Sequence, residues 1–133
     1  GENRFLSNFY TTPIVYDGHE YRSTEHAYQA AKTLDASWKR KIREAEKASE
    51  TKKLGNQAPM RSDWNEVRIE VMTDLVRIKF SKSPLKEKLL MTGDVELIEG
   101  NHWGDVFWGV CKGKGENHLG KILMRIRSEL NSK

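Results

Sequence analysis

Residues 23–32 read Ser-Thr-Glu-His-Ala-Tyr-Gln-Ala-Ala-Lys, and this stretch decides the fold because it predicts a helix that the rest of the chain can pack around. The hydroxyls of Ser23 and Thr24 are good N-cap groups. Glu25 would lie in the first turn, where the helix dipole favours a negative charge. We expect the helix to run to about Leu34.

Three polar residues of this helix share one face, since Glu25, Gln29 and Lys32 recur at nearly whole turns. Glu25 and Lys32 are about 10 Å apart along the axis, so they could bracket a ligand rather than pair directly. A carboxylate in a partly apolar pocket can act as general acid or base, and a desolvated lysine can attack a carbonyl as a free amine. The alternative is a glutamate that only stabilises the helix dipole and a solvated surface lysine.

Short strands are expected before this helix and further helices after it. Residues 14–16 and 20–21 flank Asp17-Gly18, a turn pair typical of a hairpin. Apolar spacing and capping residues predict the later elements. These are helices at 36–47, 49–54 (ended by Gly55), 62–81 (capped by Asp63), 84–90 and 117–130, and strands at 97–98 and 106–108. The prediction is a mostly helical α+β fold with a few short strands, in a single domain over 1–133.

Composition narrows the class of protein. The chain has 133 residues and no apolar run near the roughly 18 that a membrane span needs, so we expect no membrane partner and a cytoplasmic location. The single cysteine, Cys111, rules out an internal disulfide and favours a reducing compartment. With 23 basic and 19 acidic residues the net charge is +4, which a mild preference for anions or a solvated surface explains equally well.

A second polar cluster lies at 99–109, Glu-Gly-Asn-His-Trp-Gly-Asp-Val-Phe-Trp-Gly. Glycines such as Gly104 let the backbone approach a ligand, and indoles such as Trp103 offer flat faces to a base or sugar. Asp105 could position a hydroxyl or a water. The alternative is a tight loop that its tryptophans fix to the core.

A third cluster, residues 112–120, has two lysines and three glycines before a helix, which is typical of a phosphate-binding segment. It lacks the spacing of a P-loop, and Asn117 as a plain N-cap is the alternative. The four histidines share no metal-ligand spacing, so we expect no metal site. The basic stretch 39–43 is interleaved with acidic residues, which favours a solvated face over a nucleic-acid groove.

Segments that match one family run through nearly the whole chain in order and spacing. They are residues 5–9 (Phe-Leu-Ser-Asn-Phe), 24–29 with Lys32, 53–55, Trp64, 71–72, 79–80, Thr92, Glu99, 103–104, 117–120, 123–124 and Arg127. With these segments the sequence resembles the NADAR (NAD- and ADP-ribose-associated, YbiA-like) family. Some members carry a leading strand before the position of Phe5, and we expect it to be missing or replaced here.

The resemblance implies a YbiA-like fold and an N-glycosidase that needs no metal or redox cofactor. Family members cleave ribosylamino bonds in early riboflavin-pathway intermediates or remove ADP-ribose from guanine bases in DNA. Carried over by position, Glu25 and Lys32 are the expected catalytic pair. The expected substrate-binding residues are Asn8, Gln29, Trp103, Gly104, Asp105 and Asn117.

Three functions follow from this resemblance. The first is removal of ADP-ribose from guanine in DNA or nucleosides, with Glu25 as acid/base and Lys32 forming a Schiff base; the basic balance and the tryptophans favour this substrate. The second is cleavage of phosphoribosylamino-pyrimidine intermediates. The third is a non-catalytic module that binds ADP-ribose or NAD, against which the retention of both Glu25 and Lys32 weighs. The sequence indicates no oligomeric state.

Overall fold

The computed structural model describes residues 3–132, which form two compact units, one ending at Lys79 and the other beginning at Phe80. In both units helices supply more residues than the few short strands do, which confirms the predicted α+β class. None of the helices within residues 3–132 is long and apolar enough to cross a membrane. Each unit is described by itself.

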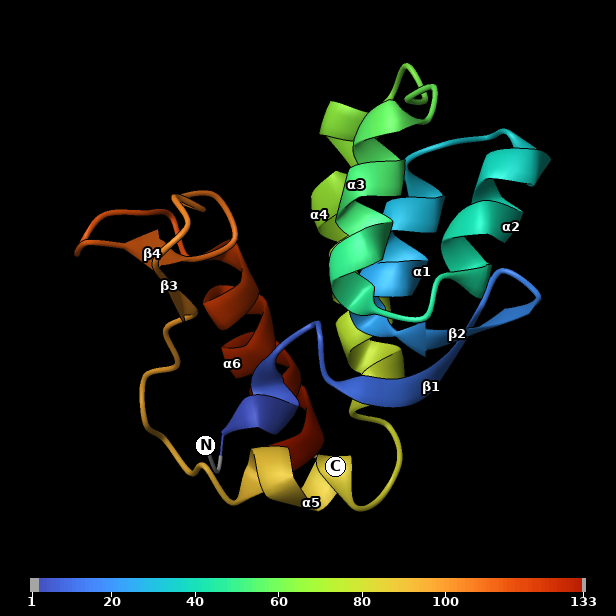
Figure 1. The fold of residues 1–133 in the computed structure, drawn as a ribbon. Coiled ribbons are helices and arrows are strands. Elements are labelled where there is room, and N and C mark those ends of the chain that lie inside the picture. The colour runs from blue at the N-terminus through green and yellow to red at the C-terminus, as the bar shows by residue number, and fades with distance from the viewer. Residues whose placement is uncertain (1–2, 133) are drawn as a thin grey trace. The chain divides into compact units, whose positions relative to one another are not determined.

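The first unit opens with a short 3-10 helix, η1 (Arg4–Leu6), and the predicted hairpin. Strand β1 (Thr11–Tyr16) pairs antiparallel with β2 (His19–Ser23), as Figure 1 shows. The turn residues Asp17 and Gly18 have φ of 50° and 81°. Two successive left-handed residues are what a tight hairpin turn requires, and this is why the Asp-Gly pair predicts it.

Helix α1 (Thr24–Ala31) lies at the centre of the first unit, in contact with β1, β2 and three helices, and all its residues are buried. It begins as predicted at Ser23, whose hydroxyl accepts the backbone N–H of His26 at 3.1 Å. It ends at Ala31 rather than near Leu34. The chain leaves the helix because Thr33 and Asp35 form the next cap: Thr33 Oγ1 accepts the N–H of Asp35 at 3.2 Å.

Helix α2 (Ala36–Glu44) is capped by Asp35, whose Oδ1 accepts the N–H of Ser37 at 2.9 Å and that of Trp38 at 3.1 Å. It ends three residues before the predicted Lys47. The reason is Ala45, whose carbonyl accepts from His26 Nε2 at 2.8 Å and so leaves the helical path.

Helix α3 (Ala48–Gln57) corrects one expectation, because Gly55 does not end it but lies within it. A Cβ atom at position 55 would overlap the side-chain oxygen of Gln29 on α1. The glycine therefore serves the close packing of α3 against α1.

Helix α4 (Trp64–Lys79) follows the predicted amphipathic pattern, with a buried face that includes Trp64, Val71, Met72, Leu75 and Val76. Asp63 precedes it as expected, but its carboxylate pairs with Arg61, with an Nε–Oδ1 distance of 2.6 Å. The backbone carbonyl of Asp63 accepts the N–H of Glu66 at 3.0 Å and so joins the first turn.

The second unit contains α5 (Leu85–Leu90), the two-residue parallel strands β3 (Gly100–Asn101) and β4 (Val110–Cys111), and α6 (His118–Asn131). The predicted strands at 97–98 and 106–108 were wrong. The carbonyls of Val106, Phe107 and Trp108 instead accept N–H groups at the start of α6, at 2.7 to 3.1 Å. N–H groups at the N-terminus of the helix thus donate hydrogen bonds to carbonyls that a neighbouring strand would otherwise pair with.

Candidate active site

The first turn of α1 holds the buried carboxylate of Glu25, whose residue is only 7% exposed. The backbone N–H of Glu25 donates to the carbonyl of Asn8 at 3.0 Å, and this bond joins the N-terminal segment to the start of the helix. Asn8 is buried too, and its Nδ2 lies 3.5 Å from Met72 Sδ. Two residues predicted for the site are therefore neighbours, although 17 positions separate them in the sequence.

Gln29 lies one turn further along α1 and fixes the orientation of Glu25. Its Nε2 donates a hydrogen bond to Glu25 Oε2 at 2.7 Å. The other end of the amide, Oε1, is buried against Gly55 and has no hydrogen-bond partner among residues 3–132. Gln29 thus holds the carboxylate at one end of its amide and packs against α3 at the other.

Lys32 caps the C-terminal end of α1 and is half-buried. Its Nζ donates to Asn56 Oδ1 on α3 at 3.5 Å. Burial lowers the pKa of Lys32; the Glu25 carboxylate opposes this and raises it, and Lys52 lowers it further. A lowered pKa increases the fraction of neutral amine, which is the nucleophilic form.

His26 is fully enclosed beside Glu25 and holds the first turn of α1 in place. Its Nε2 donates to the carbonyl of Ala45 at 2.8 Å, because a carbonyl can only accept. When the ring is neutral, its Nδ1 then accepts the hydroxyl of Ser23 at 2.7 Å. Burial lowers the pKa of His26 and so favours this neutral form.

The second unit holds Trp103, Gly104 and Asp105 in the loop between β3 and β4. Trp103 is 57% exposed, and Gly104 has a φ of 89°. Asp105 Oδ1 accepts the N–H groups of Phe107 at 3.1 Å and Trp108 at 2.9 Å, so this carboxylate oxygen shapes the loop. A role of Asp105 or Trp103 in substrate binding stays a prediction.

Asn117 stands at the N-cap position of α6 with a left-handed φ of 55° but makes no side-chain cap bond. Its Oδ1 accepts the N–H of Glu99 at 2.9 Å and its Nδ2 donates to the carbonyl of Leu97 at 3.0 Å. These two hydrogen bonds therefore hold residues 97–99 against the start of the helix. The lysine- and glycine-rich segment before it forms an exposed turn in which Cys111 and Lys114 exchange backbone hydrogen bonds.

The structure thus gathers Asn8, Glu25, Gln29 and Lys32 around α1 in the first unit. Trp103, Gly104, Asp105 and Asn117 belong to the second unit, and their part in substrate binding stays a prediction. Within residues 3–132 no group of three histidine, cysteine or carboxylate side chains is placed to hold a metal ion.

Sequence reasoning missed four supporting residues: His26, Gly55, Asn56 and Asn101. Asn101 holds the tryptophan loop, since its Nδ2 donates to the Asp105 carbonyl at 2.8 Å. A signal existed only for Gly55, because an isolated glycine inside a helical pattern can indicate close packing. The other three are polar residues whose partners come from distant segments.

Comparisons with known proteins agree over nearly the whole chain. The family model described as the NADAR domain matches residues 1–131. A riboflavin biosynthesis protein of Vibrio vulnificus is 45% identical over 130 residues, which are 95% of this chain but only 35% of that protein. The N-glycosidase YbiA of Escherichia coli is 35% identical over 129 residues, 94% of this chain and 80% of its own. An N-glycosidase of Nostoc punctiforme is 37% identical over 134 residues, 96% of this chain and 85% of its own.

A solved structure extends this similarity to the fold. The NMR structure of Escherichia coli YbiA matches with a TM-score of 0.86 at 34% identity, and the match covers 96% of this chain and 78% of that one. The chain therefore spans most of the relatives named as N-glycosidases and about a third of the riboflavin biosynthesis protein.

Proposed function

This chain belongs to the NADAR family, which includes N-glycosidases, and we propose that it cleaves the bond between a ribose C1 and an amine nitrogen. One observation carries the proposal: α1 holds a buried, oriented carboxylate at its start and a lysine of lowered pKa at its end. The Glu25 carboxylate also acts electrostatically on the Lys32 ammonium, so the two groups belong to one electrostatic environment.

Glu25 is the proposed general acid and base. In its acid form it donates a proton to the ring oxygen of the ribosylamine, and the C1–O bond opens to leave C1 doubly bonded to the substrate nitrogen. A carboxyl group buried in the first turn of α1 is placed to give and take this proton. The hydrogen bond from Gln29 keeps the carboxyl group at one orientation through this step.

Lys32 is the proposed nucleophile. Its neutral Nζ adds to C1, a proton moves from this lysine nitrogen to the substrate nitrogen, and the C1–N bond of the substrate breaks to release a neutral amine. The lysine remains as a Schiff base on C1. Water then adds to C1, the lysine leaves, and the free sugar closes its ring. Two moderate barriers thus replace one large barrier.

The preferred substrate is ADP-ribosylated guanine, in DNA or as a nucleoside. The chain has a net charge of +4, which suits the pyrophosphate of ADP-ribose and, in DNA, the backbone phosphates. The exposed indole of Trp103 offers a stacking face for an adenine ring. Two exposed lysines, Lys112 and Lys114, add positive charge to a glycine-containing turn.

A second candidate is a phosphoribosylamino-pyrimidine. The observation in its favour is the 45% identity to a protein named for riboflavin biosynthesis. Both substrates join a ribose C1 to an amine nitrogen, so the same two residues would perform the same chemistry on either.

Product release from the two substrates tests the proposal. The protein is incubated separately with an oligonucleotide bearing ADP-ribosylated guanine and with the ribosylaminopyrimidine phosphate, and the freed base or pyrimidine is quantified by chromatography. Release of unmodified guanine-containing DNA supports the first candidate, and release of the pyrimidine alone replaces it with the second. If the protein binds ADP-ribose tightly but cleaves neither substrate, the enzymatic proposal fails and a binding module is left.

A further inference from the structure

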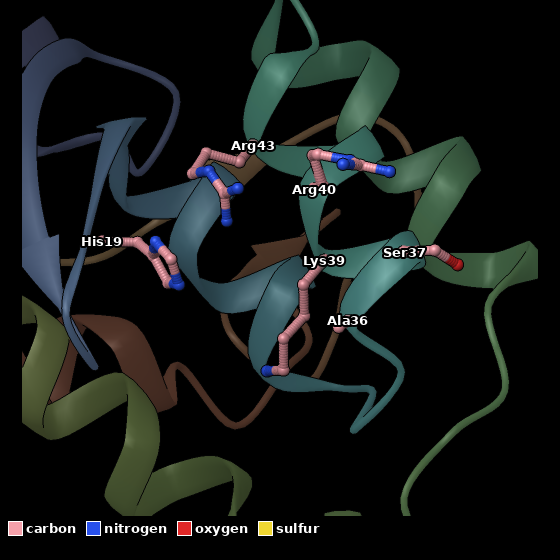
Figure 2. Close-up of a pocket in the computed structure, with 6 residues that line it drawn as sticks. All are labelled: His19, Ala36, Ser37, Lys39, Arg40 and Arg43. Carbon is pink, nitrogen blue, oxygen red and sulfur yellow. The ribbon is translucent and has the colours of Figure 1, made fainter.

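A cation-lined hollow lies on α2, apart from the residues assigned to the proposed chemistry. We name it the α2 pocket; its volume is about 410 Å³, and its lining residues are His19, Ala36, Ser37, Lys39, Arg40 and Arg43. Figure 2 shows the His19 ring and the Arg43 guanidinium extending toward the same space from β2 and α2, with Lys39 below them. All six residues belong to the first unit.

The lining of the α2 pocket is strongly one-sided in charge. Lys39, Arg40 and Arg43 are cations, and neither an aspartate nor a glutamate lines it. Two acids act nearby: Asp17 interacts electrostatically with Lys39, and Asp35 accepts hydrogen bonds from the Ser37 hydroxyl and from the first backbone N–H groups of α2. The Asp35 carboxylate is therefore engaged in capping the helix.

Two of the three cations are fixed by the fold, and one is free. Lys39 Nζ donates to the carbonyl of Ala30 at 2.9 Å, and the Arg43 guanidinium interacts electrostatically with the side chain of Tyr21. Arg40 is exposed and makes no hydrogen bond or ion pair with any residue from 3 to 132. Its planar guanidinium can donate two parallel hydrogen bonds to a phosphate.

We propose that the α2 pocket binds a backbone phosphate of a nucleic-acid strand, which departs from the solvated face expected from the sequence for residues 39–43. The inference builds on the proposed function, because a modified guanine within DNA brings its flanking phosphodiesters to the protein. The Arg40 guanidinium, which has no partner among residues 3–132, extends away from the Arg43 and Lys39 head groups (Figure 2), so it is open to one such group. Nonspecific contacts of this kind give affinity and place the strand without reading its sequence.

The lining residues of the pocket and the charges near it favour a polymer over a small phosphorylated ligand. The one aromatic ring among its lining residues is the His19 imidazole, and only Ala36 contributes an apolar side chain. A small ligand would therefore depend on charge alone. Lys41 on the same helix lies outside the lining, 4.5 Å above the ring of Trp38, and extends the positive surface along α2. An extended polyanion can use these charges together.

Binding of an unmodified DNA oligonucleotide tests this inference without requiring any cleavage. Fluorescence anisotropy measures the Kd of a labelled strand of about 20 nucleotides over a range of salt concentrations. We expect Arg40→Gln to weaken binding by roughly three- to tenfold. The plot of log K against log salt should become less steep, its negative slope shrinking in magnitude by about 0.7 to 1, as for one lost phosphate contact. Lys121→Gln on α6, exposed and of equal charge change, is the matched control and should change neither quantity by a comparable amount.

Two further measurements separate this inference from others. Glu25→Gln should bind the oligonucleotide like the unmodified protein, so failure of the glycosidase proposal and failure of this one are distinguishable. Inorganic phosphate added at constant ionic strength should compete only weakly. The inference is overturned if Arg40→Gln and Lys121→Gln give the same Kd and salt slope, or if inorganic phosphate binds and the strand does not.

Discussion

The side-chain amide of Gln29 donates a hydrogen bond to Glu25 Oε2 at 2.7 Å, and Gly55 on α3 leaves the space that Gln29 occupies. Three helical positions are thus linked: Gly55 leaves room for the Gln29 side chain, and Gln29 orients the Glu25 carboxylate. A change at Gly55 should consequently reach the chemistry through Gln29, even though a glycine has no side chain to take part in it.

Gly55→Ala should lower kcat at least tenfold while changing stability little. An added Cβ overlaps the end of the Gln29 side chain, which is flexible and can move, so the loss falls on the Glu25–Gln29 hydrogen bond. Alanine also gains about 1 kcal/mol over glycine within a helix, which offsets the cost of repacking. Steady-state kinetics and thermal unfolding measure the two effects.

The control for this change is Gln57→Ala, an exposed position on the same helix, which should leave kcat unchanged. Adding Gln29→Ala to Gly55→Ala removes the steric overlap and should restore the packing that thermal unfolding reports. The double variant should nevertheless stay inactive, because it lacks the Gln29 amide that orients Glu25. A Gly55→Ala protein of normal kcat would show that the Gln29 hydrogen bond does not orient a catalytic group.

Glu25→Gln should reduce turnover by roughly 10²- to 10⁴-fold, the usual contribution of a positioned acid or base. The amide is isosteric and can still bond to Gln29, so the fold and substrate binding should persist. Calorimetric titration with ADP-ribose and single-turnover kinetics distinguish lost chemistry from lost binding. Turnover within twofold of the unmodified protein would remove Glu25 from the mechanism.

The rate should rise with pH along a limb that reports the free amine of Lys32. Because burial places the pKa of Lys32 below its ordinary 10.5, the midpoint of this limb should lie below 10.5. Lys52 contributes to the lowering, so Lys52→Gln should move the midpoint upward. Lys47→Gln, an exposed lysine at the start of α3, is the control and should not move it. An unshifted limb in Lys52→Gln would contradict the assignment to Lys32.

Stability should fall on acidification because His26 is held neutral. Its pKa in the folded protein lies below the ordinary 6.5, so the unfolded chain binds more protons as the pH drops. The contribution of neutral His26 to the free energy of unfolding is therefore fully present above pH 6.5. It is lost progressively as the pH falls from there to the lowered pKa. Urea unfolding at several pH values measures this dependence.

Two variants identify His26 as its source. His26→Gln should lose part of the pH dependence and about 1–3 kcal/mol of stability at neutral pH, because bonds to Ser23 and Ala45 are disrupted. His102→Gln, at an exposed histidine, should change neither. Equal acid sensitivity in all three proteins would assign the effect to other groups.

Local signals in the sequence were sufficient for the elements that depend on local chemistry. The Asp17-Gly18 turn, the cap at Ser23 and the apolar face of α4 were all predicted correctly because their determinants lie within a few residues. The shared face of Glu25 and Gln29 follows from helical periodicity alone, and the structure converts it into a hydrogen bond.

Features that depend on distant partners could not be predicted in this way. Gly55 looks like a helix stop until Gln29 is placed beside it, and Val106-Phe107-Trp108 looks like a strand until α6 supplies the donors for its carbonyls. Asn117 has the residue type and position of an N-cap, yet its side chain forms hydrogen bonds with the backbone of Leu97 and Glu99, which lie about 20 residues earlier. Tertiary packing at Gly55, and tertiary hydrogen bonding in the other two cases, overrode local preference.

Trapping with borohydride most directly tests covalent chemistry at Lys32. Reduction during turnover converts a Schiff base into a stable amine, and tryptic mass spectrometry locates the added sugar. We expect the adduct on Lys32 in the unmodified protein, its absence in Lys32→Arg, and normal recovery in Lys121→Gln. An adduct of equal yield in Lys32→Arg, or full turnover with no adduct in the unmodified protein, would contradict the proposed mechanism.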